Sequence, residues 1–111
     1  MIKTIALLML CAFAALAQTA HSATLTWADT LNPPATTYSV YRATGLCSGT
    51  PTYAKIATAL TAKTYEDTTV QPGNYCYTVT ASYNGMESAP SNTAGAPVPS
   101  FPPASLNVTV K

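Results

Sequence analysis

The chain has 111 residues, which is enough for one small domain. Its formal net charge is +1, and only 8% of its residues are charged, so it carries neither a basic patch that would attract phosphates nor an acidic run. We therefore expect no nucleic-acid partner.

The N-terminal segment has the pattern of a Sec-type signal peptide. Lys3 precedes an apolar run, Ile5 to Ala17, that is too short to span a membrane and has no stop-transfer pattern after it. Residues 1–23 are therefore predicted to be a signal peptide, with cleavage after Ala23 favoured and cleavage after Ala17 as the alternative. The mature protein would be secreted, either extracellular or periplasmic, and would meet the membrane only through the cleaved signal peptide.

The cysteines indicate an oxidising compartment. Processing removes Cys11 and leaves Cys47 and Cys76, and two cysteines in an exported chain indicate one disulfide. A redox or metal-binding pair is disfavoured, because there is no C-x-x-C motif and the one histidine, His21, lies at the predicted cleavage region. In the chain-entropy model a bridge over this separation stabilises the fold by roughly 3–4 kcal/mol.

The rest of the chain has the periodicity of strands. Short alternating runs are separated by Pro, Gly and Asn, and no run has a useful helical period, so an all-β sandwich is predicted. In chain order, the predicted strands cover residues 23–29, 36–44, 53–58, 63–68, 75–83 and 92–98. The third is short and the last contains a proline, so both are expected at sheet edges.

Alternation also predicts the core. The side chains expected to be buried are Leu25, Trp27, Tyr38, Val40, Tyr65, Tyr77 and Val79. Trp27 is expected in the core rather than as a platform for sugar stacking. Tyr41 and Tyr83 are the aromatic residues expected at the surface, and they would carry a carbohydrate site if the protein has one.

No catalytic arrangement is predicted. A Ser-His-Asp or Cys-His arrangement needs a histidine, and His21 lies in the predicted signal peptide. Asp67 is expected to cap the turn that leads to Gln71, with calcium ligation as the alternative. Glu87 is expected to be a solvated loop residue. We therefore expect no enzyme activity, no cofactor and no metal.

Several motifs, taken in this order, resemble a fibronectin type III domain of the bacterial extracellular kind. They are Leu25-x-Trp27, Tyr38-x-Val40-Tyr41-Arg42, Tyr65-x-Asp67-Thr68, Pro72-Gly73-Asn74-Tyr75-x-Tyr77-x-Val79-x-Ala81 and Glu87-Ser88-Ala89-Pro90-Ser91-Asn92. The resemblance covers residues 24–98 and implies an immunoglobulin-like β-sandwich.

The resemblance also assigns roles to particular residues. It implies that Tyr75 is a tyrosine corner, whose hydroxyl bonds to nearby backbone, although the turn before it is one residue shorter than usual. In this fold the strands that correspond to residues 36–44 and 75–83 pair antiparallel. That pairing brings Cys47, just past the end of one, close to Cys76, near the start of the other.

One departure from the family concerns its first strand. That strand would have to come from the signal peptide, so it is expected to be missing. After a Pro-rich linker, residues 99–103, the segment 104–111 resembles the missing strand, with three apolar side chains on one face: Leu106, Val108 and Val110.

This segment separates the two functions that the sequence favours. One is a structural subunit that assembles head to tail by donating residues 104–110 to a neighbour, and the other is a monomeric adhesion or carbohydrate-binding accessory module. The linker spans at most about 18 Å, whereas returning along a seven-residue strand needs about 23 Å, so self-completion in the family's orientation is disfavoured. The alternative is that the segment folds back as a hairpin, in the reverse direction, against an edge strand of its own domain. The expected partners are a second copy or another extracellular protein, with carbohydrate as the alternative.

Overall fold

The computed structural model describes residues 20–111, and the predicted signal peptide before residue 20 lies outside them. The described chain has no helix. Its strands are β1 (Ala23–Thr26), β2 (Thr37–Thr44), β3 (Ala54–Leu60), β4 (Thr64–Asp67), β5 (Gly73–Tyr83), β6 (Met86–Glu87) and β7 (Ala94–Val98). Residues 21–100 form one compact unit, and residues 101–111 lie outside it.

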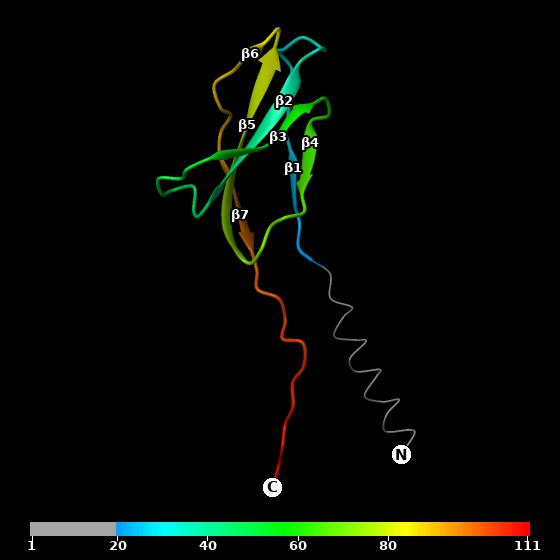
Figure 1. Ribbon diagram of the computed structural model, residues 1–111, viewed down its shortest axis with the longest axis vertical. Coiled ribbons are helices and arrows are strands. Elements are labelled where there is room, and N and C mark those ends of the chain that lie inside the picture. The colour runs from blue at the N-terminus through cyan, green and yellow to red at the C-terminus, as the bar shows by residue number, and fades with distance from the viewer. Residues whose placement is uncertain (1–19) are drawn as a thin grey trace, which may run out of the picture. The chain divides into compact units, whose positions relative to one another are not determined.

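The strands form two antiparallel sheets (Figure 1). The smaller sheet pairs β1 with β4, and the larger has the order β3-β2-β5-β6, with β7 paired to the start of β5. The two longest strands, β2 and β5, pair from Thr37 opposite Ser82 to Thr44 opposite Tyr75. The all-β sandwich predicted from the sequence is thus confirmed.

Strands β2 and β5 hold the centre of the core. Tyr38, Val40 and Tyr77 are buried, as alternation predicts, and Val40 has no exposed surface at all. The chain leaves β5 through Asn84 and Gly85, whose φ angles are 51° and 76°. Two successive positive φ angles suit a tight hairpin turn and favour Asn-Gly.

The core is smaller than the sequence predicts. Leu25, Trp27, Tyr65 and Val79 were expected to be buried, but all four are only half-buried. The described smaller sheet has only two strands, so it covers less of the larger sheet than a complete sandwich would. Side chains that no further described strand covers keep part of their surface in contact with water.

The C-terminal segment also differs from the prediction. A strand was expected at residues 104–111, but the structure assigns no strand to residues 99–111. A strand is assigned where backbone groups form a ladder with another strand, and no ladder among residues 20–111 includes residues 104–111. The side chains of Leu106, Val108 and Val110 are 86%, 78% and 87% exposed.

Candidate functional site

A disulfide joins the two cysteines of the predicted mature chain. The sulfur atoms of Cys47 and Cys76 are bonded, and their Cα atoms lie 5.2 Å apart. Cys76 pairs with Ala43 near the end of β2, and Cys47 follows soon after. The predicted bridge is therefore confirmed, and it fixes the loop after β2 to the start of β5.

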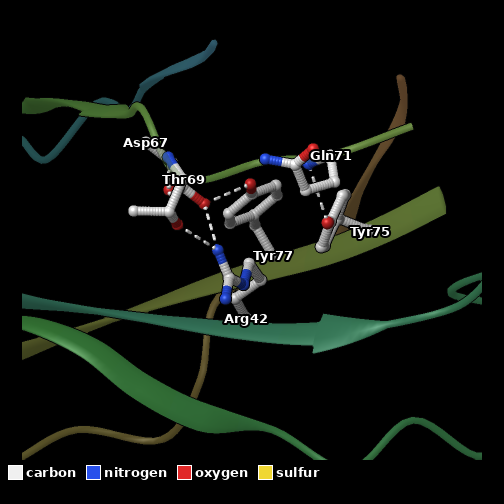
Figure 2. A network of polar contacts seen from close by, with 6 residues as sticks. All are labelled: Arg42, Asp67, Thr69, Gln71, Tyr75 and Tyr77. Atoms are coloured by element: carbon white, nitrogen blue, oxygen red, sulfur yellow. Dashed lines mark hydrogen bonds and ion pairs between the residues drawn. The ribbon is translucent and has the colours of Figure 1, made fainter. Parts of the chain in front are cut away.

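A buried carboxylate connects the two sheets (Figure 2). Asp67, at the end of β4, is 1% exposed and accepts hydrogen bonds from four groups. Arg42 donates from β2 at 2.8 Å and Tyr77 donates from β5 at 2.7 Å. The backbone N–H and the hydroxyl of Thr69 donate from the following turn at 3.0 and 2.7 Å. Asp67 thus caps this turn, as expected, and also forms an ion pair that the sequence analysis did not predict.

The hydrogen bonds decide the charge state of this network. Burial on its own would raise the pKa of Asp67, but the bonds from Thr69, Tyr77 and Arg42 outweigh it and hold the pKa at about 2. Burial, and then the Asp67 carboxylate, raise the pKa of the Tyr77 phenol well above its ordinary value. The network is therefore a structural one, with every member held in its ordinary ionisation state at neutral pH.

Tyr75 makes the bond expected of a tyrosine corner (Figure 2). Its hydroxyl accepts a hydrogen bond from the backbone N–H of Gln71, four residues upstream, at 3.0 Å. The guanidinium of Arg42 lies over the Tyr75 ring, 5.2 Å from the centroid. The turn before β5 is thereby tied to the same side of the sandwich as Asp67.

A groove of about 520 Å³ runs between β1 on one side and β5 and β7 on the other. Leu25 and Trp27 line one wall, and Val79 lies in β5 on the opposite side. Strand β7 also lines the groove, through Ala94, Gly95 and Ala96, which have small or no side chains. Leu25 and Trp27, two of the half-buried core residues, therefore face a groove whose walls mix apolar side chains with the polar ones of Thr78, Ser91 and Asn92.

One edge of β1 borders this groove without a strand partner. Among residues 20–111, β4 is the strand that pairs with β1, and no strand pairs with its other edge. An unpaired edge presents a row of N–H and C=O groups that a further strand can bind. The predicted open edge beside Trp27 is present in the described residues.

A second groove of about 520 Å³ lies on the other face of the larger sheet. Tyr41 and Tyr53 line it together with Thr78 and Thr80 of β5 and the segment that starts at Glu87. Glu87 is exposed, as predicted, but it accepts hydrogen bonds from Tyr41 at 2.6 Å and from the Thr80 hydroxyl. These bonds lower its pKa.

The structure separates the two predicted surface aromatics, Tyr41 and Tyr83. Tyr41 lines the second groove, whereas Tyr83, at the end of β5, lines a different and smaller hollow. The sequence analysis missed Tyr53, because it precedes β3 in a stretch without clear alternation. It also missed Arg42, although the alternation that turns Tyr38 and Val40 inward turns Arg42 the same way.

The described residues hold no cluster of three or more His, Cys, Asp or Glu side chains placed to bind a metal ion. Within residues 20–111 there is also no helix with the length and apolar character needed to cross a membrane.

Comparison with known proteins identifies the family. No family model and no curated protein matches the chain. Among solved structures, an Fn3-like protein from Clostridium thermocellum is 41% identical, with a TM-score of 0.56, and the alignment covers 67% of this chain and 73% of that one. The chain belongs to the fibronectin type III-like family. The resemblance seen in the motifs is thus confirmed, and the fold is generally that of a non-enzymatic module.

Proposed function

We propose that this fibronectin type III-like protein is an exported, non-catalytic structural subunit that assembles head to tail by donating residues 104–110 to a neighbouring copy. The observation that carries this proposal is the exposed apolar face of that segment: Leu106, Val108 and Val110 are all more than three quarters exposed. The same chain also offers an unpaired strand edge beside the groove that Leu25 and Trp27 line. A single chain therefore carries both halves of a strand-exchange contact, a donor segment and an acceptor edge.

Two opposing free-energy terms act on the donated segment, the burial of its apolar side chains and the ordering of its backbone. Burying a Val or Leu side chain returns about 1.5–3 kcal/mol, while fixing one residue's backbone costs about 1–2 kcal/mol. Pro102 and Pro103 hold their φ angles near one value before the tail is donated, which lowers the cost of ordering the approach to the donated segment. A head-to-tail contact of this kind does not close on itself, so repeated donation yields a filament.

Export is supported by the disulfide and by the N-terminal pattern. The Cys47–Cys76 bridge fits an oxidising compartment. Residues 1–19, which carry the apolar run, lie outside the described residues, so the signal peptide stays a prediction. The proposal places the assembled subunits outside the cytoplasm, at the cell surface or in the periplasm.

The proposal is tested by sizing the exported protein with and without its C-terminal segment. The full chain and a variant that lacks residues 102–111 are expressed with the natural leader and purified without reductant. We expect a concentration-dependent series of multimers from the full chain and a monomer from the shortened one. A monomer in both samples over the whole concentration range would contradict the proposal.

A second candidate function, a monomeric carbohydrate-binding accessory module, is favoured by the groove that contains Tyr41 and Tyr53. Its walls combine aromatic rings with hydroxyls and the Glu87 carboxylate, which is the mixture of apolar surface and a few polar groups typical of ligand sites. Affinity electrophoresis in gels that contain soluble polysaccharides tests it. Retardation that is lost in Tyr53→Ala and kept in Tyr83→Ala would support this function, and no retardation in any gel would count against it.

A further inference from the structure

We infer where and how the donated strand binds: it pairs with the free edge of β1, antiparallel to it, with Asn107 opposite Thr26 and Thr109 opposite Thr24. This inference rests on the proposed function and adds to it the acceptor site, the direction of the strand and its register. Four observations carry it: the backbone groups of β1, the faces of its side chains, the direction of β7 and the small residues of β7.

The backbone hydrogen bonds of β1 show which of its groups are free. The N–H of Trp27 donates to the carbonyl of Lys63 at 3.1 Å. The carbonyl of Leu25 accepts a bond from the Thr64 hydroxyl at 2.9 Å. Leu25 and Trp27 therefore direct their backbone groups toward β4. Since these groups alternate along an antiparallel strand, the N–H and C=O groups of the intervening residues point to the free edge.

Side-chain faces then restrict which donor residues can pair with those groups. All four residues border the groove, but the intervening residues Thr24 and Thr26 are exposed, whereas Leu25 and Trp27 are half-buried and so lie on the inner face of the strand. Residues directly opposite each other in an antiparallel pair lie on the same face of the sheet. Asn107 and Thr109 must therefore lie opposite the two threonines, so that the apolar donor residues between them face the groove.

Only one register uses all three apolar donor residues. With Asn107 opposite Thr26, the inward pairs are Trp27 with Leu106 and Leu25 with Val108. Val110 then faces the position of Ala23, which stays in the mature chain when cleavage follows Ala17. Moving the donor by two residues in one direction carries Val110 past the start of β1. Moving it two residues in the other direction puts Leu106 opposite Asp29, a carboxylate that accepts hydrogen bonds from Asn32 and Tyr38.

The direction follows from where the strands begin and end. Trp27 contacts Tyr38, which pairs with Ala81 near the end of β5. Ala23 pairs with Asp67, which binds Tyr77 near the start of β5. Strand β1 thus runs in the same direction as β5, and β7 runs in the opposite direction (Figure 1).

Strand β7 therefore ends on the side of the domain where β1 begins, so a neighbour stacked beyond that side in the same orientation presents the Trp27 end of its β1 to the donated tail. The tail then runs toward Ala23, antiparallel to β1. Every strand pair in the described domain is antiparallel, so the added strand extends the existing pattern. Ala94, Gly95 and Ala96 leave room for it on the side of β7.

Cysteine pairs test the register directly. The two outward pairs become Thr24→Cys with Thr109→Cys, and Thr26→Cys with Asn107→Cys, each in one chain that keeps Cys47 and Cys76. Directly opposite residues in a hydrogen-bonded pair have Cα atoms about 5.5 Å apart, within reach of a disulfide. We expect both variants to give a ladder of covalent multimers on non-reducing gels.

The crossed pairs serve as matched controls. Thr24→Cys with Asn107→Cys, and Thr26→Cys with Thr109→Cys, use the same four positions, but the residues are offset by two, so little or no ladder is expected. A parallel strand would link both crossed pairs, and a shifted antiparallel register would link one of them. Either result overturns the inference.

The remaining outcomes separate this inference from the proposed function. Multimers on sizing that form no ladder with any of the four pairs would leave donation in place and refute β1 as the acceptor. Links confined to single chains would show self-pairing and overturn both. Sizing chromatography and peptide mapping of the native bridge check that each variant is folded.

Discussion

Trp27 packs edge-on against Tyr38, with ring centroids 5.5 Å apart and ring planes inclined at 62°. Tyr38 is buried, but Trp27 is only half-buried and lines the groove between β1 and β7. The contact therefore holds the indole against the larger sheet and leaves the rest of it beside an unpaired strand edge. An aromatic side chain in this position is suited to receive apolar side chains from a further strand.

Removing the disulfide should destabilise the domain. We expect Cys47→Ala with Cys76→Ala to lower the free energy of unfolding by about 2–5 kcal/mol, because the bridge restricts the unfolded chain. Urea denaturation followed by fluorescence measures this change. Wild-type protein unfolded with reductant present should show the same loss, and an unchanged midpoint in both cases would contradict a structural role for the bridge.

Replacing the buried carboxylate should cost more than replacing its exposed neighbour. Asp67→Asn removes the charge that Arg42 faces, and breaking such a pair typically lowers stability by about 3–5 kcal/mol. Glu66→Gln is the matched control, because Glu66 is the adjacent residue and is exposed. Glu66→Gln should change the free energy of unfolding by no more than about 0.5 kcal/mol. Equal effects of the two substitutions on the urea midpoint would refute the proposed role of the network.

Acid should weaken the same network. The pKa of Asp67 falls from its ordinary value of 3.8 to about 2 in the folded protein. A lowered folded-state pKa contributes stability that is complete above the unfolded value and is lost as the pH falls through the folded one. We therefore expect urea midpoints to fall between about pH 4 and pH 2.

Asp29 and Glu87 also have lowered pKa values and add to this acid dependence. The contribution of Asp67 alone is found by comparing the wild type with Asp67→Asn. The urea midpoint of the variant should fall less steeply between about pH 4 and pH 2. Parallel profiles for the wild type and the variant would mean that Asp67 contributes no pH-dependent stability.

The hydroxyl of Tyr75 should make a small, separable contribution. Tyr75→Phe removes the acceptor for the Gln71 N–H and keeps the ring beneath Arg42, so we expect a loss of about 0.5–1.5 kcal/mol. Tyr83→Phe, at the exposed end of β5, is the control and should be neutral. Thermal unfolding by circular dichroism is sensitive enough to tell them apart.

The sequence predicts the strands and the bridge well because both depend on local or unambiguous signals. Alternation in β2 and β5 identifies Tyr38, Val40 and Tyr77 as core residues. Removal of Cys11 with the predicted signal peptide leaves two cysteines and therefore one pairing. Burial at Leu25 and Trp27 could not be predicted in the same way. Their alternation shows which face of the strand is apolar, but the degree of burial depends on whether another strand covers that face.

The site residues likewise fall into two groups, those that a local sequence pattern predicts and those that depend on tertiary contacts. The apolar face of residues 104–110 is visible as a pattern, and so is the expected open edge of β1. The ion pair of Arg42 with Asp67 and the groove beside Tyr53 depend on contacts between strands far apart in the sequence. For Arg42 a signal was present, because period-2 alternation places it on the same face as Val40, where a charged side chain needs a partner.

The most direct test of the account is to put a charge on each face of the donated segment and to measure the size of the exported protein. Val108→Asp places a carboxylate on the face that the account buries, and Asn107→Asp places the same group on the opposite face, one residue away. The account predicts that Val108→Asp gives a folded monomer with the Cys47–Cys76 bridge intact, while Asn107→Asp keeps the multimers of the wild type. Multimers that persist in Val108→Asp, or that disappear equally in both variants, would contradict it.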